Sequence, residues 1–200
     1  GSAAVFYPAE YTAALTAKKA DPQARFFLTA GAKGTVWLDM ISLFPEKTFK
    51  GRANGLRPEI AQMIADLKPG FIRFPGGCVV EGATPENAYD WKKSIGPIEQ
   101  REEIWNVWDY RRTHGLGFFE YFQLCEDLGA EPVPVINCGM CCQARRGPPV
   151  PLNELGPYVQ DALDLIEFAN GPATSAWGAR RAPMGHPAPF NLKFLAVGNE

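Results

Sequence analysis

The stretch Leu195-Ala196-Val197-Gly198-Asn199-Glu200 joins a short apolar run to an amide and a carboxylate. A strand buried in a parallel sheet is a nearly continuous hydrophobic run, and its polar residues come where it surfaces at its carboxyl end. We therefore predict a parallel strand over residues 192–197, with Asn199 and Glu200 at the rim of the sheet. Enzymes built as barrels of alternating strands and helices place their chemistry at that rim.

The neighbouring acid and amide suit the cleavage of a glycosidic bond. The carboxylic acid of Glu200 can donate a proton to the leaving oxygen, and the amide of Asn199 can grip a sugar hydroxyl. Most Asn-Glu pairs in proteins are solvated loop residues, so this pair gains meaning from the rest of the chain.

Upstream of this stretch, helical and strand patterns alternate. Apolar residues at helical spacing predict helices over 58–67, 118–128 and 158–168, and the last has Val159, Ala162, Leu163 and Ile166 on one stripe. Pro58 suits a first helical turn, and Gly129 suits a helix end. Strands are predicted at 71–74 and 132–137, although proline inside the second is unusual.

This alternation predicts an α/β fold with a parallel sheet. The strands recur about every 60 residues, roughly double the ~30 of a minimal strand-helix-strand unit, and the excess follows the strands, where barrel enzymes keep their substrate loops. A doubly wound open sheet is the structural competitor. No Gly-x-Gly-x-x-Gly or Walker loop follows any strand, which disfavours the nucleotide-binding versions.

The N-terminal region has a different pattern. Residues 26–28 and 35–41 are predicted to form two strands around the glycine-containing turn 31–34. A composition break follows at 44–47. We expect residues 1–44 to be the end of a β-sandwich and residues 45–200 to form a separate α/β region.

Composition excludes several classes of protein. The chain is 46% apolar and 21% charged, as in ordinary globular proteins, and its net charge of −2 gives no basic footprint for nucleic acid or an anionic membrane. No apolar run has the length of a membrane span, and no signal-peptide pattern opens the chain. The chain starts with Gly1-Ser2, which resembles a cloning remnant. The lack of a signal-peptide pattern therefore leaves the compartment open.

The five cysteines form an odd set, with three of them in Cys138-x-x-Cys141-Cys142. This spacing invites a zinc or redox interpretation, but no second cysteine pair or nearby histidine completes four ligands, because His114 and His186 lie far away in sequence. We therefore expect no metal and no cofactor. Free thiols and one local disulfide both stay open.

Several segments, in order and spacing, resemble glycoside hydrolase family 51, in its bacterial and plant type of α-L-arabinofuranosidase. The segments are Phe71-Ile72-Arg73-Phe74-Pro75-Gly76-Gly77, Trp91 with Ile95-Gly96-Pro97 and Arg101, Trp108 before Gly117, Gly129-Ala130-Glu131 with Val135-Ile136-Asn137, and Gly198-Asn199-Glu200. The resemblance implies a (β/α)8 TIM barrel and a retaining mechanism with two carboxylates. It also implies an incomplete chain that holds about strands two to four and lacks the nucleophilic Glu.

The resemblance assigns roles to five residues of this sequence. Glu200 matches the general acid/base, and Asn199 matches the amide that binds the sugar 2-hydroxyl. Arg73 matches an arginine that keeps the nucleophile ionised, although a structural salt bridge would use the same residue. Trp108 matches an aromatic wall of the arabinose subsite, with core packing as its alternative. Cys78 stands where some members carry an Asn that contacts the sugar.

The resemblance also implies a substrate class and its rivals. The expected partner is an arabinose-containing oligosaccharide or polysaccharide such as arabinan or arabinoxylan, and a secreted or periplasmic location is expected. An endo-glucanase or xylosidase activity on the same barrel is the nearest rival, since a fold does not fix its substrate. A non-catalytic carbohydrate-binding fragment is the alternative from another class. The oligomeric state stays open.

Overall fold

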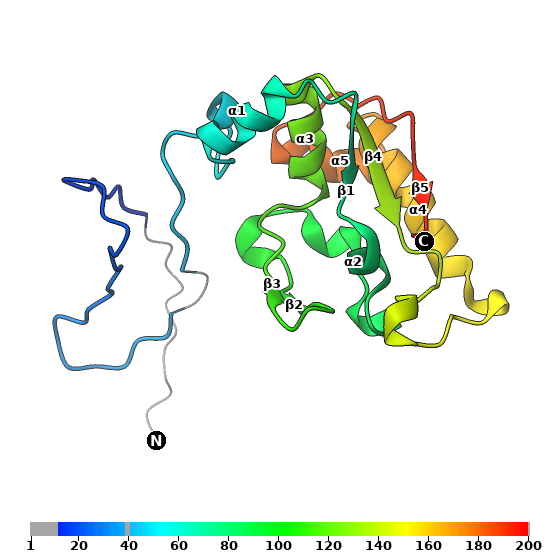
Figure 1. The fold of residues 1–200 in the computed structure, drawn as a ribbon, viewed down its shortest axis with the longest axis horizontal. Coiled ribbons are helices and arrows are strands. Elements are labelled where there is room, and N and C mark those ends of the chain that lie inside the picture. The colour runs from blue at the N-terminus through cyan, green and yellow to red at the C-terminus, as the bar shows by residue number, and fades with distance from the viewer. Residues whose placement is uncertain (1–11, 39–40, 200) are drawn as a thin grey trace. The chain divides into compact units, whose positions relative to one another are not determined.

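The computed structural model of the chain describes residues 12–38 and 41–199 (Figure 1). By its internal contacts the chain divides into two units, residues 1–39 and residues 40–200. Among the described residues, no helix combines the length and the apolar character needed to cross a membrane.

The described part of the first unit, residues 12–38, contains no helix and no strand. The strands predicted at 26–28 and 35–41 are therefore wrong over the residues that the structure describes, while residues 39 and 40 lie outside them. Phe27 and Trp37 are solvent-exposed. A strand needs a neighbour to receive its backbone hydrogen bonds, and an isolated hairpin is marginal in water. The assignment of residues 1–44 to a β-sandwich stays a prediction.

The second unit is an α/β arrangement in which long connections follow the strands (Figure 1). Its helices and strands are α1 (Pro58–Asp66), β1 (Phe71–Phe74), α2 (Gly77–Glu81), β2 (Ile104–Trp105), β3 (Arg111–Arg112), α3 (Phe118–Leu128), β4 (Glu131–Ile136), α4 (Gly156–Asn170), α5 (Gly178–Arg181) and β5 (Ala196–Val197). Short 3₁₀ turns lie at Phe49–Gly51, Pro85–Asn87, Trp91–Ser94, Ile98–Gln100, Gln143–Arg145, Leu152–Glu154 and Ala182–Met184.

The predicted parallel sheet is confirmed. Its three strands lie in the order β1-β4-β5, with both pairs parallel. The carboxyl ends of all three strands therefore meet at one edge, which is the edge where polar residues were predicted. The strand predicted over 192–197 is shorter than expected, because hydrogen-bonded pairing begins at Ala196. β2 and β3 form a separate antiparallel pair within the connection between β1 and α3.

The prolines of β4 are tolerated because of the side that they face. The N–H of Glu131 donates to the carbonyl of Gly70, 3.0 Å away on the β1 side. Successive residues of a strand direct their backbone groups to opposite neighbours, so Pro132 and Pro134 face the β5 side. β5 pairs with β4 only from Val135 onward among the described residues. The missing proline N–H groups thus lie where this sheet has no bond to make.

Helix α3, predicted over the same residues, packs an apolar face into the core. Phe118, Phe122 and Cys125 are buried, and the Phe118 and Phe122 rings meet Phe74 of β1 edge-on with centroids 5.2 and 5.5 Å apart. Gly129 ends the helix in the left-handed conformation at φ 67°, as predicted. This aromatic cluster fixes α3 against the sheet and so fixes the carboxyl end of β1.

The predicted buried face of α4 is wrong. The helix buries Leu165, Phe168 and Ala169, whereas Val159 and Leu163 of the predicted stripe are exposed. The helix carries apolar residues on two sides, so periodicity alone does not select which side meets the core. The side with Phe168 prevails because its ring reaches Trp91, with centroids 5.5 Å apart.

Candidate active site

Two residues from different strands meet at the carboxyl edge of the sheet. Arg73 belongs to β1 and Asn199 follows β5, with β4 between these strands. The guanidinium Nη2 of Arg73 donates a hydrogen bond of 2.6 Å to Oδ1 of Asn199. The parallel topology therefore unites two candidate site residues that lie 126 positions apart in sequence.

This bond fixes the orientation of the Asn199 amide. Arginine has donors and no acceptor, so the atom that faces Arg73 is the amide oxygen. The Nδ2 group of Asn199 is then directed elsewhere; it is buried and has no hydrogen-bond partner within residues 12–38 and 41–199. A buried donor without a partner carries a desolvation cost that an incoming hydroxyl oxygen would relieve.

Glycines give the Asn199 side chain its space. A Cβ on Gly77 would lie 2.9 Å from Oδ1 and 3.0 Å from Nδ2 of Asn199, too close for any larger residue to be accommodated without a shift. Gly198 has φ 75°, and a Cβ there would lie 2.7 Å from the Cys138 sulfur. Gly77 and Gly198 thus have local steric reasons for being glycine, and both concern the placement of Asn199.

Asn137 and Trp91 are scaffold residues. The Asn137 amide nitrogen donates to the carbonyls of Val80 at 3.0 Å and Met140 at 3.2 Å, and its oxygen accepts from the N–H of Gly139 at 2.6 Å. Asn137 therefore ties the loop after β4 to α2. Trp91 is buried and donates from Nε1 to a backbone carbonyl of α4.

Among the described residues, Trp108 makes no hydrogen bond or ring contact with the Arg73–Asn199 pair. It lies in the turn between β2 and β3, where its backbone N–H donates to Oδ1 of Asn106 at 2.8 Å. Trp108 is 48% exposed, so it does not pack in the core that the described residues form. No hydrogen bond or ring contact of the described residues joins it to Arg73 or Asn199, and its role as a subsite wall stays a prediction.

Cys78 and Glu200 complete the predicted set. Cys78 is half-buried in α2, directly after the Gly77 that contacts Asn199. None of the five cysteines forms a disulfide, so the alternative of a local disulfide is not realised. Glu200 lies outside the described residues, and its acid/base role stays a prediction.

A cavity of about 860 Å³ lies elsewhere in the second unit. Its lining comes from the connections after β1 and β4 and from α4, and it includes Asp90, Asn137 and Tyr158. Burial raises the pKa of the Asp90 carboxyl. The lining of this cavity does not include Arg73, Cys78, Trp108 or Asn199. The Arg73–Asn199 pair therefore lies at the rim of the sheet and outside this cavity.

Comparison with known proteins identifies the family. Residues 63–200 match the family model described as the alpha-L-arabinofuranosidase 1 domain. A solved family 51 α-L-arabinofuranosidase with arabinose bound is 44% identical, with a TM-score of 0.72 over 76% of this chain and 24% of that chain. The chain belongs to glycoside hydrolase family 51. The resemblance predicted from the sequence is confirmed.

Curated relatives of this family 51 chain agree. Alpha-L-arabinofuranosidase 1 of Arabidopsis thaliana is 49% identical over 93% of this chain and 27% of the relative. The extracellular exo-alpha-L-arabinofuranosidase of Streptomyces chartreusis is 45% identical over 96% of this chain and 24% of the relative. The chain thus spans about a quarter of the length of these relatives.

Proposed function

We propose that the family 51 chain is part of a retaining α-L-arabinofuranosidase that releases terminal arabinofuranosyl residues from arabinan or arabinoxylan. The observation that carries this proposal is the Arg73–Asn199 hydrogen bond at the rim of the sheet, which leaves the amide N–H group of Asn199 without a hydrogen-bond partner among the described residues. Relatives named as arabinofuranosidases support the glycosidase class.

The proposed fold of the full-length enzyme is a (β/α)8 barrel in which β1, β4 and β5 are consecutive strands. Three adjacent parallel strands with helices between them support this proposal. Catalytic residues of such barrels lie at the carboxyl ends of the strands. Arg73 and Asn199 lie at those ends, and Glu200 follows Asn199 directly in sequence.

In the proposed mechanism, Glu200 protonates the departing glycosidic oxygen and later removes a proton from the attacking water. A second carboxylate, which the described residues do not identify, attacks the anomeric carbon of the sugar and forms a covalent intermediate as the protonated leaving group departs. The two carboxyl groups stand about 5–5.5 Å apart in retaining enzymes. Arg73 keeps the nucleophile ionised by a charge-assisted pair, while it orients Asn199.

Asn199 contributes to the transition state in this mechanism. Its Nδ2 donates to the 2-hydroxyl oxygen of the sugar, and this bond strengthens as positive charge develops on the sugar ring. Trp108 and Cys78 are proposed to line the subsite. Secretion is proposed because the Streptomyces relative is named extracellular.

Nitrophenyl glycosides test the proposed function with the full-length protein. We expect the α-L-arabinofuranoside to be hydrolysed with a higher kcat/KM than the xyloside or the glucoside. Equal or faster turnover of the xyloside or glucoside would replace the proposal by the xylosidase or glucanase alternative. Absence of turnover of all three, with the sugars still bound, would favour a non-catalytic carbohydrate-binding protein.

The contact between Asn199 and the 2-hydroxyl has its own test. Asn199→Ala is expected to lower kcat/KM on the arabinofuranoside about 100-fold, since contacts of this kind supply several kcal/mol in the transition state. A matching arabinofuranoside without the 2-hydroxyl group, the 2-deoxy substrate, lacks the oxygen that accepts the hydrogen bond from Asn199. On this substrate the same substitution should change kcat/KM less than about 3-fold. Steady-state kinetics on both substrates checks this.

Asn153→Ala is the matched control, because Asn153 is exposed in the turn at Leu152–Glu154. We expect it to leave both rates unchanged. If Asn199→Ala slows the parent and the 2-deoxy substrate by the same factor, the amide does not act through the 2-hydroxyl.

A further inference from the structure

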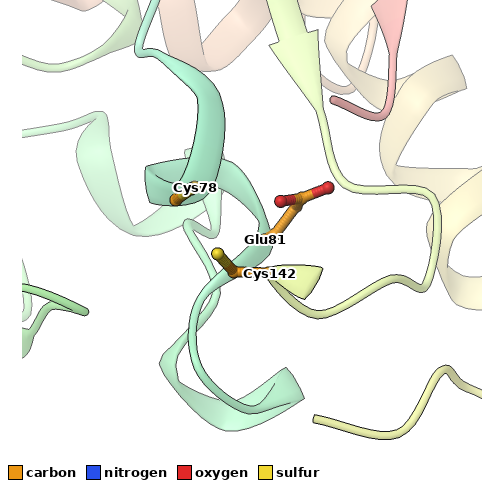
Figure 2. A group of neighbouring side chains, drawn as sticks. All are labelled: Cys78, Glu81 and Cys142. Carbon is orange, nitrogen blue, oxygen red and sulfur yellow. The ribbon is translucent and has the colours of Figure 1, made fainter. Parts of the chain in front are cut away.

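Three potential metal ligands gather between α2 and the loop after β4. Figure 2 shows the side chains of Cys78, Glu81 and Cys142 close together. One donor atom from each lies within 4.8 Å of the other two. Glu81 is 2% exposed and Cys142 is 1% exposed. Two thiols and a carboxylate are therefore collected at one place, with Glu81 and Cys142 buried and Cys78 half-buried.

The backbone holds these ligands in place. Cys78 and Glu81 are three positions apart on α2, which puts them on the same face of that helix. Cys142 is held against the helix end because its N–H donates to the carbonyl of Gly82 at 2.9 Å. Asn137 adds a second link from the same loop to the Val80 carbonyl. The cluster does not depend on flexible surface side chains for its assembly.

We propose that Cys78, Glu81 and Cys142 bind a zinc ion. Zinc takes thiolate sulfur at about 2.3 Å and carboxylate oxygen at about 2.0–2.2 Å, which places tetrahedral donors roughly 3.5–3.8 Å apart. The donors lie within 4.8 Å of one another, so they would approach by up to about 1 Å to meet this geometry. Three protein ligands leave a fourth position for water. Thiolates favour zinc over magnesium or calcium, which prefer oxygen ligands.

A metal fits this cluster better than a Cys78–Cys142 disulfide. A disulfide would join the two sulfurs and leave the Glu81 carboxylate out of the linkage. A divalent cation would bind the carboxylate and both thiolates together. The cation therefore accounts for the presence of all three side chains.

This ligand set differs from the one that the sequence suggested. Of Cys138, Cys141 and Cys142, the last alone belongs to the cluster. The Cys141 thiol donates to the carbonyl of Pro148 at 3.3 Å, and Cys138 lies against Gly198. The missing partners, Cys78 and Glu81, come from α2, 64 and 61 residues before Cys142. The expectation of no metal is revised by this proposal.

The ion would link two segments at the rim of the sheet. It would join α2 to the loop after β4, and α2 begins at Gly77, which contacts Asn199. Zinc would thus have a positioning role: it would fix Cys78, which is proposed to line the subsite, and would take no part in bond cleavage. The site goes beyond the proposed hydrolase activity and does not require it.

Cobalt binding tests the site, because Co²⁺ replaces Zn²⁺ and absorbs strongly when thiolates coordinate it. The full-length protein is reduced, freed of metal with a chelator and titrated with Co²⁺. We expect a thiolate-to-cobalt absorption band at one ion per chain, which is lost on addition of Zn²⁺. Cys142→Ala should abolish the band. Glu81→Gln should retain the fold by circular dichroism and weaken binding at least about 10-fold.

Cys125→Ala is the matched control. Cys125 is equally buried but packs in the aromatic core, and burial raises the pKa of its thiol to about 12, so it offers no thiolate at neutral pH. The control should keep the full cobalt band. The proposal is overturned by absence of the band, by an unchanged band in Cys142→Ala, or by a Cys78–Cys142 disulfide found by mass spectrometry of the unreduced protein.

Discussion

Glu200→Gln in the full-length enzyme is expected to lower kcat/KM on arabinofuranosides with poor leaving groups by about 10²–10⁴-fold, the usual contribution of general acid catalysis. The amide keeps the shape of the carboxyl group but does not transfer a proton. Activated aryl arabinofuranosides need little protonation of the leaving oxygen, so their glycosylation step should be affected less. A series of aryl substrates with graded leaving groups measures this difference as a slope.

Glu131→Gln is the control for this series. Glu131 is the first residue of β4 and pairs with Lys193, so it lies at the opposite end of the sheet from the candidate site. Its substitution should leave the slope unchanged. Equal losses on poor and activated substrates in Glu200→Gln would count against an acid role for Glu200.

The base role of Glu200 can be separated from its acid role. With Glu200→Ala, hydrolysis of the glycosyl-enzyme intermediate slows, because no group activates the water. Azide needs no base, so it should restore turnover of an activated substrate and give an arabinofuranosyl azide. An Ala variant whose rate does not respond to azide would argue that Glu200 is not the base in a retaining reaction.

The parallel sheet was predictable because its signals are local. Each strand is a short apolar run after a helical pattern, and Pro58 and Gly129 mark a helix start and a helix end that the structure reproduces. The prolines of β4 weakened that prediction. Their tolerance depends on which neighbour each backbone group faces, and this is a property of the assembled sheet.

The wrong predictions concern features that depend on tertiary contacts. The α4 helix has apolar residues on two sides, and contact of Phe168 with Trp91 selects the buried one. The N-terminal strands predicted at 26–28 and 35–41 have suitable residues but form no sheet over the residues that the structure describes. Strand formation depends on pairing more than on intrinsic preference.

In the candidate site, too, the sequence predicts single residues but not the contacts between distant segments. Arg73 and Asn199 were each found from short segments, but their direct hydrogen bond is a consequence of strand order. The cluster of Cys78, Glu81 and Cys142 was missed because its members come from two separate connections. The i, i+3 spacing of Cys78 and Glu81 on a short helix was the one local signal for it.

Arg101 anchors the long connection that carries Trp108, and its loss is expected to be the most damaging to stability. Its side chain is 1% exposed, and its guanidinium donates to both carboxylate oxygens of Glu120 at 2.7 and 2.9 Å. It also donates to the carbonyls of Gly96 and His114. Glu120 in turn accepts from the N–H of Gly117 at the start of α3. One guanidinium thus joins two turns of the connection to a helix end.

Arg101→Met should lower the free energy of unfolding by about 3–5 kcal/mol, because it leaves Glu120 without its buried partner and strips donors from buried carbonyls. Arg111→Met is the matched control, since Arg111 pairs with Glu103 at 3.1 Å but is 72% exposed. Exposed pairs of this kind contribute about 0–1 kcal/mol. Urea denaturation of both variants in the full-length protein makes the comparison. If the two losses agree within about 1 kcal/mol, Arg101 does not hold the connection, and the position of Trp108 must depend on other contacts.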